Sequence, residues 1–258
     1  MSPLVRRRIS RKMEKTELHG TENPQKRLSD LYRSRREEIR RRLEEFKAIY
    51  EDSEERIFAE LCFCICTPQS SALICWKRIK DLSESRILYG GDKQEIAAGL
   101  VGVRFKENKT RFIVEARERF SIDGKLAVRS RLEQMAEERN RELVLSYSHR
   151  TENKQDMTAR EAGNLREALA DGIRGLGMKE ASHFLRNIGL GGELAILDRH
   201  ILRNLAEYQV IDEVPKVLSR KTYLGIEEKM HRFSRSIGIP MDELDLLLWA
   251  KETGIVFK

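Results

Sequence analysis

The chain has 258 residues and a mass of 30.1 kDa, enough to bury a full core as one large domain or two small ones. Its formal net charge of +7 permits a nucleic-acid partner. The sequence contains no signal peptide and no apolar run of about 18 residues, so we expect a cytoplasmic protein and no membrane partner.

The N-terminal fifth of the chain carries the whole charge excess. Residues 1–50 hold 15 Lys and Arg against 8 Asp and Glu, a balance of +7, so the remainder is neutral overall. Residues 1–26 have little apolar periodicity, which predicts a flexible basic tail. This tail is either a non-specific DNA contact or an extension without a role. From residue 27 to residue 50, apolar residues recur on one side, which predicts a long charged helix.

Helical periodicity recurs along the rest of the chain, and the alternation typical of strands is nearly absent. Gly and Pro turn signals separate the helical stretches. The fold class is therefore predicted to be all-α. The predicted helices cover residues 54–66, 70–82, 93–101, 107–120, 125–147, 158–170, 178–188, 199–207, 215–236 and 241–252.

The four cysteines of the chain, Cys62, Cys64, Cys66 and Cys75, lie in one apolar stretch. Residues two apart on a helix face different directions, so the C-x-C-x-C pattern does not converge on a metal ion. We expect buried structural cysteines, with no metal site and no disulfide framework.

A Gly-Leu-Gly turn follows the helix predicted over 158–170. Gly175 and Gly177 permit positive φ angles and a close backbone approach, and a second helix is predicted directly after them. Free N–H groups at the start of that helix favour an anion such as a DNA phosphate. This pattern predicts a helix-hairpin-helix that holds the phosphate backbone without reading sequence. The alternative is an ordinary connection between helices.

Two residues give this hairpin a chemical interpretation. Lys179 is predicted to lie in the first turn of the second helix, where the helix dipole disfavours a second positive charge and so favours a nucleophilic amine. Asp198 precedes the helix predicted over 199–207, where aspartate is also a favoured N-cap. Cleavage of a glycosidic bond by amine attack requires a nucleophile and a charge partner of this kind. Each residue alone is weak evidence, since most lysines are solvated and aspartate is a common cap, but the turn, the lysine and the aspartate at this spacing together favour this chemistry.

The sequence GLGMKEAS, followed by LDRHI, resembles the helix-hairpin-helix and Gly/Pro-Asp signature of the endonuclease III superfamily of DNA glycosylases. Within that superfamily the chain looks most like the archaeal, second-type 8-oxoguanine DNA glycosylase/AP lyases. The segments LCFCICTPQSSA and DLLLWAKETGIVFK also resemble that group, so the similarity covers roughly residues 30–258. One departure is Ile196, which stands where Pro or Gly usually precedes the aspartate by two residues.

The resemblance implies two helical subdomains with the active cleft between them. Residues 53–190 would form a helical barrel that includes the hairpin, and residues 27–52 and 191–258 would pack together as the second subdomain. Gln69 would fill the hole left by an extruded base, and His200 would contact a phosphate near the lesion.

The resemblance also suggests a base pocket built from the C-terminal segment. Trp249 would lie against the base, with Asp245 one turn earlier on the same face. The free α-carboxylate of Lys258 would accept hydrogen bonds from the N1–H and N2–H₂ donors of guanine, and Met135 would add an apolar contact. The ordinary alternatives are a core tryptophan and a frayed chain end.

The activity implied by the resemblance is excision of 8-oxoguanine from double-stranded DNA through a lysine Schiff base and β-elimination, with no metal or cofactor. We expect a monomer associated with the nucleoid. Two alternatives stay open: a glycosylase for another damaged or mismatched base, and a non-enzymatic helix-hairpin-helix module that binds DNA for a partner.

Overall fold

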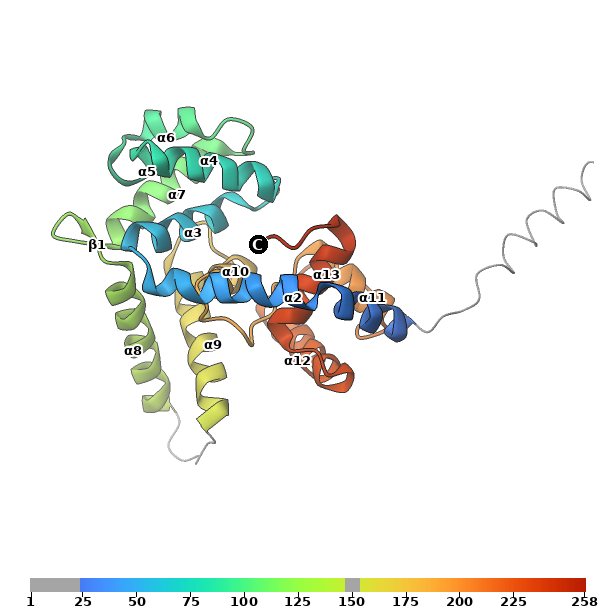
Figure 1. Cartoon of the computed structure of the whole chain (residues 1–258). Coiled ribbons are helices and arrows are strands. Elements are labelled where there is room, and N and C mark those ends of the chain that lie inside the picture. The colour runs from blue at the N-terminus through green and yellow to red at the C-terminus, as the bar shows by residue number, and fades with distance from the viewer. Residues whose placement is uncertain (1–23, 147–153) are drawn as a thin grey trace, which may run out of the picture.

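The computed structural model describes residues 24–146 and 154–258, which are mostly helical (Figure 1). The predicted all-α class is confirmed. Most of the tail predicted over residues 1–26 lies outside the described residues, but the helix begins earlier than predicted, at Pro24. The elements are α2 (Pro24–Glu51), α3 (Glu54–Cys66), α4 (Ala72–Glu84), α5 (Ile87–Gly90), α6 (Lys93–Gly99), α7 (Lys106–Arg119), β1 (Ser121–Ile122), β2 (Lys125–Leu126), α8 (Val128–Ser146), α9 (Lys154–Gly172), α10 (Met178–Asn187), α11 (Arg199–Glu207), α12 (Arg220–Ile237) and α13 (Met241–Thr253).

Helix α3 lies in the core, and every residue from Ile57 to Cys66 is buried. The helix begins after Ser53, whose Oγ accepts a hydrogen bond from the Arg56 backbone N–H at 3.2 Å. It ends before Pro68, because proline has no backbone N–H to donate to the preceding turn of the helix. Helices α4, α7, α8 and α10 pack around it. All four cysteines are buried and have free thiols, as predicted.

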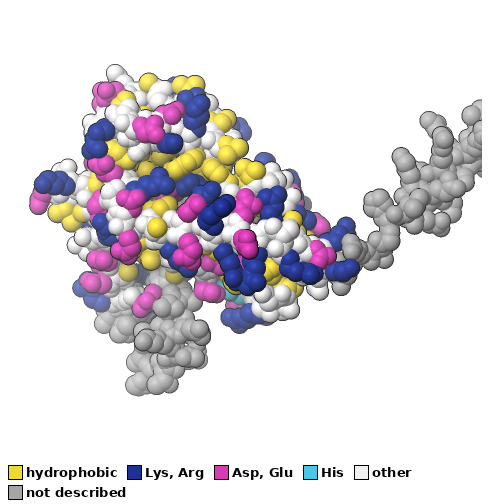
Figure 2. Space-filling view, in the orientation of Figure 1, with side chains coloured by type: hydrophobic (Ala, Val, Ile, Leu, Met, Phe, Trp, Pro, Cys, Tyr) yellow, Lys and Arg dark blue, Asp and Glu magenta, His cyan; other side chains and the backbone are white. Residues whose placement is uncertain are grey.

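Helix α2 joins the helices around α3 to the C-terminal helices, because it packs against α13, α10 and α3 (Figure 1). Two polar contacts fix it to α13: the Tyr32 hydroxyl donates to Glu243 Oε2 at 2.6 Å, and Arg40 Nε donates to Glu243 Oε1 at 3.1 Å. Lys and Arg side chains gather along its outer face (Figure 2). The division into two subdomains stays a prediction.

Several boundaries differ from the predicted ones. The helix predicted over 125–147 begins only at Val128, because Lys125 and Leu126 pair antiparallel with Ile122 and Ser121 across the Asp123-Gly124 turn. Helix α12 begins at Arg220 rather than 215, where the Ser219 side chain caps it. The short helix α5 was not predicted. No helix within the described ranges is both long and apolar enough to cross a membrane.

Candidate active site

A cleft of about 960 Å³ lies between the α3–α4 loop, the start of α10, the segment that precedes α11, and α13. Residues that the sequence places far apart meet in it. The predicted site residues that line it are Gln69, Lys179, Asp198, His200, Asp245, Trp249 and Lys258. The cleft therefore brings the predicted nucleophile, its charge partner and most of the predicted base pocket to one place.

The turn between α9 and α10 has the geometry of the predicted hairpin. Gly175 adopts a φ of +88°, and a Cβ atom at this position would lie 2.7 Å from Cδ2 of Phe112, so a side chain does not fit. Gly177 is the N-cap of α10. Both glycines line a second, smaller hollow of about 410 Å³, which Gln69 also borders. The helix-hairpin-helix is confirmed as a structure, and its contact with DNA stays a prediction.

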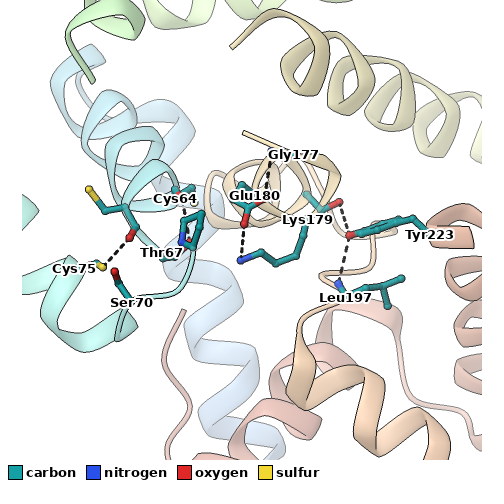
Figure 3. Close-up of polar contacts among 12 residues, drawn as sticks. Cys64, Thr67, Ser70, Cys75, Gly177, Lys179, Glu180, Leu197 and Tyr223 are labelled. Atoms are coloured by element: carbon teal, nitrogen blue, oxygen red, sulfur yellow. Dashed lines mark hydrogen bonds and ion pairs between the residues drawn. The ribbon is translucent and has the colours of Figure 1, made fainter. Parts of the chain in front are cut away.

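Lys179 lies in the first turn of α10, as predicted. Its Nζ atom is 2.9 Å from Oε1 of the neighbouring Glu180, whose Oε2 accepts a hydrogen bond from the Gly177 backbone N–H at 3.2 Å (Figure 3). The Lys179 side chain is 23% exposed, so its amine can be reached from the cleft. Sequence reasoning missed Glu180.

Asp198 is the N-cap of α11, as predicted. Its Oδ1 atom accepts hydrogen bonds from the backbone N–H groups of His200 at 2.7 Å and Ile201 at 2.9 Å. These two bonds hold the carboxylate at the positive end of the helix dipole. Within the described residues, Asp198 makes no ion pair at 4.0 Å or less, so it does not contact Lys179 directly.

The segment before α11 is irregular, and a buried network from α12 holds it. The Tyr223 hydroxyl donates to the Ala195 carbonyl at 2.5 Å. It accepts a hydrogen bond from the Leu197 N–H at 3.3 Å (Figure 3). Glu227 Oε2 accepts from the Ala195 N–H at 2.8 Å and pairs with Arg166 at 2.5 Å. Sequence reasoning missed this network, since a polar side chain on an amphipathic helix gives no sign of its partner.

The loop that carries Gln69 is held by a buried lysine from α7. Lys109 is 4% exposed, and its Nζ atom lies 2.6 Å from the Cys66 carbonyl, 2.9 Å from the Pro68 carbonyl and 2.9 Å from Ser70 Oγ. These acceptors match the three protons of an ammonium group. Gln69 is exposed and has a φ of +56°, an uncommon conformation for a residue other than glycine. Lys109 was not predicted either.

Lys258 is not a frayed chain end: its side chain is buried and lies at the floor of the cleft. Its ammonium pairs with the buried Glu60 and lies 3.7 Å above the ring centre of Trp76. The other Glu60 oxygen accepts from Asn187 Nδ2 at 3.1 Å. Burial lowers the pKa of Lys258, although Glu60 opposes the shift. The predicted role of the α-carboxylate stays a prediction.

A second buried pair lies beside it. Arg186 Nη1 is 3.5 Å from Asp245 Oδ2, and burial raises the pKa of Asp245 to about 7 although Arg186 opposes the shift. Burial also lowers the pKa of His183 well below its usual value, so this imidazole is neutral at pH 7. Trp249 is half-buried with its ring 6.2 Å from that of Phe257.

The rim of the cleft is basic. His200 lies there with Nδ1 3.8 Å from Glu252 Oε2. Arg104 and Arg199 also line the cleft and are exposed, which suits contact with phosphates. Sequence reasoning missed both arginines, although Arg199 directly follows the predicted charge partner.

The structure does not place Met135 at the cleft. This side chain is buried with the core on α8, and its Cε atom would lie 3.6 Å from a Cβ atom built on Gly172. Helix α8 packs against α9 and α3, and Met135 is not among the residues that line the cleft. The expected pocket contact of Met135 therefore has no support in this arrangement.

Comparison with known proteins agrees with this geometry. Residues 39–239 match the family described as 8-oxoguanine DNA glycosylase. A Fusobacterium nucleatum protein named 8-oxoguanine DNA glycosylase/AP lyase is 42% identical over 232 residues, which cover 90% of this chain and 96% of the relative.

Two solved structures are similar over nearly the whole chain. The crystal structure of Methanocaldococcus jannaschii 8-oxoguanine DNA glycosylase has a TM-score of 0.71 and 33% identity, and the match covers 91% of this chain and 95% of that one. The glycosylase/lyase from the same organism, in complex with a 15mer DNA containing 8-oxoguanine, has a TM-score of 0.69 and 33% identity, with 91% and 99% coverage.

The narrower resemblance to an archaeal group is not supported, because the relatives come from bacteria as well as archaea and the F. nucleatum protein is bacterial. The family match spans well over half of the chain, and it includes the hairpin, Lys179 and Asp198. This chain belongs to the 8-oxoguanine DNA glycosylase family.

Proposed function

We propose that this protein is a bifunctional DNA glycosylase/AP lyase that excises 8-oxoguanine from double-stranded DNA. One observation carries the proposal: Lys179 and Asp198 line the same cleft, and Lys179 lies at the start of the second helix of the helix-hairpin-helix. A module that only binds DNA would need the hairpin, but it would not need an accessible amine and a fixed carboxylate beside it.

In this mechanism the neutral amine of Lys179 attacks C1′ of the deoxyribose and displaces the oxidised base. Asp198 stabilises the positive charge that develops on the sugar, because its carboxylate is held in place by two backbone hydrogen bonds. The lysine adduct opens to a Schiff base, and β-elimination then cuts the strand on the 3′ side of the lesion.

The remaining predicted residues have roles consistent with their places. Gly175 and Gly177 hold a phosphate at the hairpin, and Gln69 enters the stack where the base has left it. Asp245, Trp249 and Lys258 lie on the floor and wall of the cleft, where an extruded base would be bound. The protein works as a monomer on nucleoid DNA.

The test is borohydride trapping on a duplex with one 8-oxoguanine opposite cytosine, comparing the wild type with Lys179→Gln. We expect a covalent protein–DNA band with the wild type and none with Lys179→Gln, and both proteins should bind the duplex. Loss of binding in the variant would indicate misfolding.

A second duplex separates the alternatives. If the wild type traps an abasic site but not 8-oxoguanine, the lyase chemistry is right and the proposed base is wrong. If it traps neither, the protein is a DNA-binding module and the proposed function fails.

A further inference from the structure

The contact between Lys179 and Glu180 is unusual in its geometry. Consecutive residues on a helix point in different directions and do not normally meet. Here the Glu180 side chain turns back toward the start of α10, because its Oε2 atom accepts the hydrogen bond from the Gly177 N–H. Gly177 has no side chain to return a hydrogen bond, so only this half of a capping box is present, and it leaves Oε1 beside the Lys179 amine, at 2.9 Å (Figure 3).

The two oxygens of Glu180 therefore have separate partners. One completes the N-terminus of the helix, and the other lies at hydrogen-bonding distance from the predicted nucleophile. The Glu180 side chain is 13% exposed and lines the cleft, so it is shielded from bulk water yet lies beside the substrate space.

Asp198 is in a different situation. Both hydrogen bonds that it accepts go to Oδ1 and come from the backbone of α11. Among the carboxylates of the described residues, Glu180 alone lies within 4.0 Å of the Lys179 amine. The carboxylate that contacts the amine and the carboxylate that caps α11 therefore belong to different residues.

We propose that Glu180 is the general base that takes a proton from Lys179, an inference that rests on the proposed function. An N–H bond of the ammonium breaks, an O–H bond forms at Oε1, and the freed lone pair on Nζ attacks C1′. The glutamic acid then gives its proton to water. Charge is conserved in each step, and Asp198 is left to stabilise the developing oxocarbenium ion.

The simpler interpretation is that Glu180 only caps the helix. Glu180→Gln separates the two roles, since the amide oxygen still accepts from Gly177 N–H but the side chain cannot take up a proton. Glu180→Ala removes both roles. A matched control is Glu95→Gln, because the Glu95 side chain also accepts a hydrogen bond from the backbone N–H of its N-cap residue, Asp92, at 2.8 Å, and does not line the cleft.

The experiment measures single-turnover excision of 8-oxoguanine and borohydride trapping on a preformed abasic site, from pH 6 to pH 10. For Glu180→Gln we expect both rates at pH 7 to fall about 100- to 1,000-fold, as for loss of a general base. The deficit should shrink toward pH 10, because hydroxide then takes the proton instead. Added formate should restore part of the rate of Glu180→Ala. Glu95→Gln should match the wild type.

A wild-type rate for Glu180→Gln together with a slow Glu180→Ala would overturn the proposal and leave Glu180 as a cap. A deficit that stays constant with pH would overturn it as well. Failure of the proposed function is distinguishable, because the wild type itself would then trap on neither duplex. If the wild type is trapped only on the abasic duplex, the trapping rates of the variants are compared on that substrate.

Discussion

Two buried ion pairs lie at the floor of the cleft, and they differ in how fully their atoms are partnered. In the pair of Lys258 and Glu60, one carboxylate oxygen binds the ammonium and the other binds Asn187. In the pair of Arg186 and Asp245, by contrast, Asp245 Oδ1 and Arg186 Nε have no hydrogen-bond partner within the described residues. In the first pair both carboxylate oxygens are partnered, whereas in the second a buried donor and a buried acceptor have no partner among the described residues.

From this comparison we expect a break in the pair of Lys258 and Glu60 to lower the stability of the fold. Loss of the Asp245 carboxyl should instead change how stability depends on pH. Buried polar groups are normally hydrogen-bonded, and exceptions deserve an explanation.

The largest effect is expected from Glu60→Gln. This change leaves the Lys258 ammonium buried without a counter-charge, which should lower the free energy of unfolding by about 3–5 kcal/mol in urea titrations at pH 7. Glu55→Gln is the control, because Glu55 pairs with Arg86 at the surface and its loss should cost less than about 1 kcal/mol. Equal losses in the two variants would mean that Glu60 is hydrated.

Asp245→Asn should change how stability depends on pH. The pKa of Asp245 rises from its usual 3.8 to about 7, so between these values the folded protein keeps a proton that the unfolded chain has lost. This group therefore contributes stability that is fully present below pH 4 and is lost as the pH rises through 7.

The variant lacks this contribution. The free energy of unfolding of the wild type, relative to Asp245→Asn, should therefore fall by roughly 4 kcal/mol between pH 4 and pH 8, at about 1.4 kcal/mol for each unit of pKa. Urea titrations of both proteins across that range measure the difference. A difference that stays constant with pH would mean that Asp245 is ionised throughout.

Lys109→Met extends the comparison to a third buried cation. Lys109 has a full set of acceptors, so its replacement should lower the stability of the fold, as a break in the pair of Lys258 and Glu60 does. We expect a loss of about 2 kcal/mol in unfolding free energy, because the Cys66 and Pro68 carbonyls are left unpaired. Lys106→Met on the same helix is exposed and should stay within about 0.5 kcal/mol of the wild type. A neutral Lys109→Met would show that the Gln69 loop holds its shape without it.

The smallest effect is expected from Tyr223→Phe, which removes a neutral group. The Ala195 carbonyl and the Leu197 N–H lose their partner, so the cost in unfolding free energy should be about 1 kcal/mol. We also expect slower excision with unchanged DNA affinity, because the segment before Asp198 loosens. Weaker DNA binding by this variant would contradict that assignment.

Local signals account for what could be predicted from the sequence. Glycine spacing and apolar periodicity were enough for the hairpin, and the N-cap preference of aspartate was enough for Asp198. These features depend on residues within a few positions of one another. The same is true of the buried cysteines, which occupy one apolar helix.

The polar interior of the cleft could not be predicted in this way. Glu60 and Lys258 are separated by 198 positions, and each alone looks like a surface residue. Lys109 and Tyr223 likewise support loops that lie elsewhere in the sequence. Glu180 adjoins Lys179 in the sequence, but the carboxylate and the amine meet only because the Glu180 side chain turns back to accept a hydrogen bond from the Gly177 N–H. Met135 is buried on α8 and does not line the cleft, so its contact with the base stays a prediction.

The lysine amines around the site differ in how far they are buried. Of the lysines that line the two hollows, Lys109 and Lys258 are buried: the Lys109 ammonium donates to three oxygens, and the Lys258 ammonium pairs with Glu60. Lys179 alone keeps a partly exposed amine, with one carboxylate beside it. An electrophilic sugar in the cleft therefore meets a single available nucleophile, and the packing around the lysines makes the chemistry selective for one amine among three.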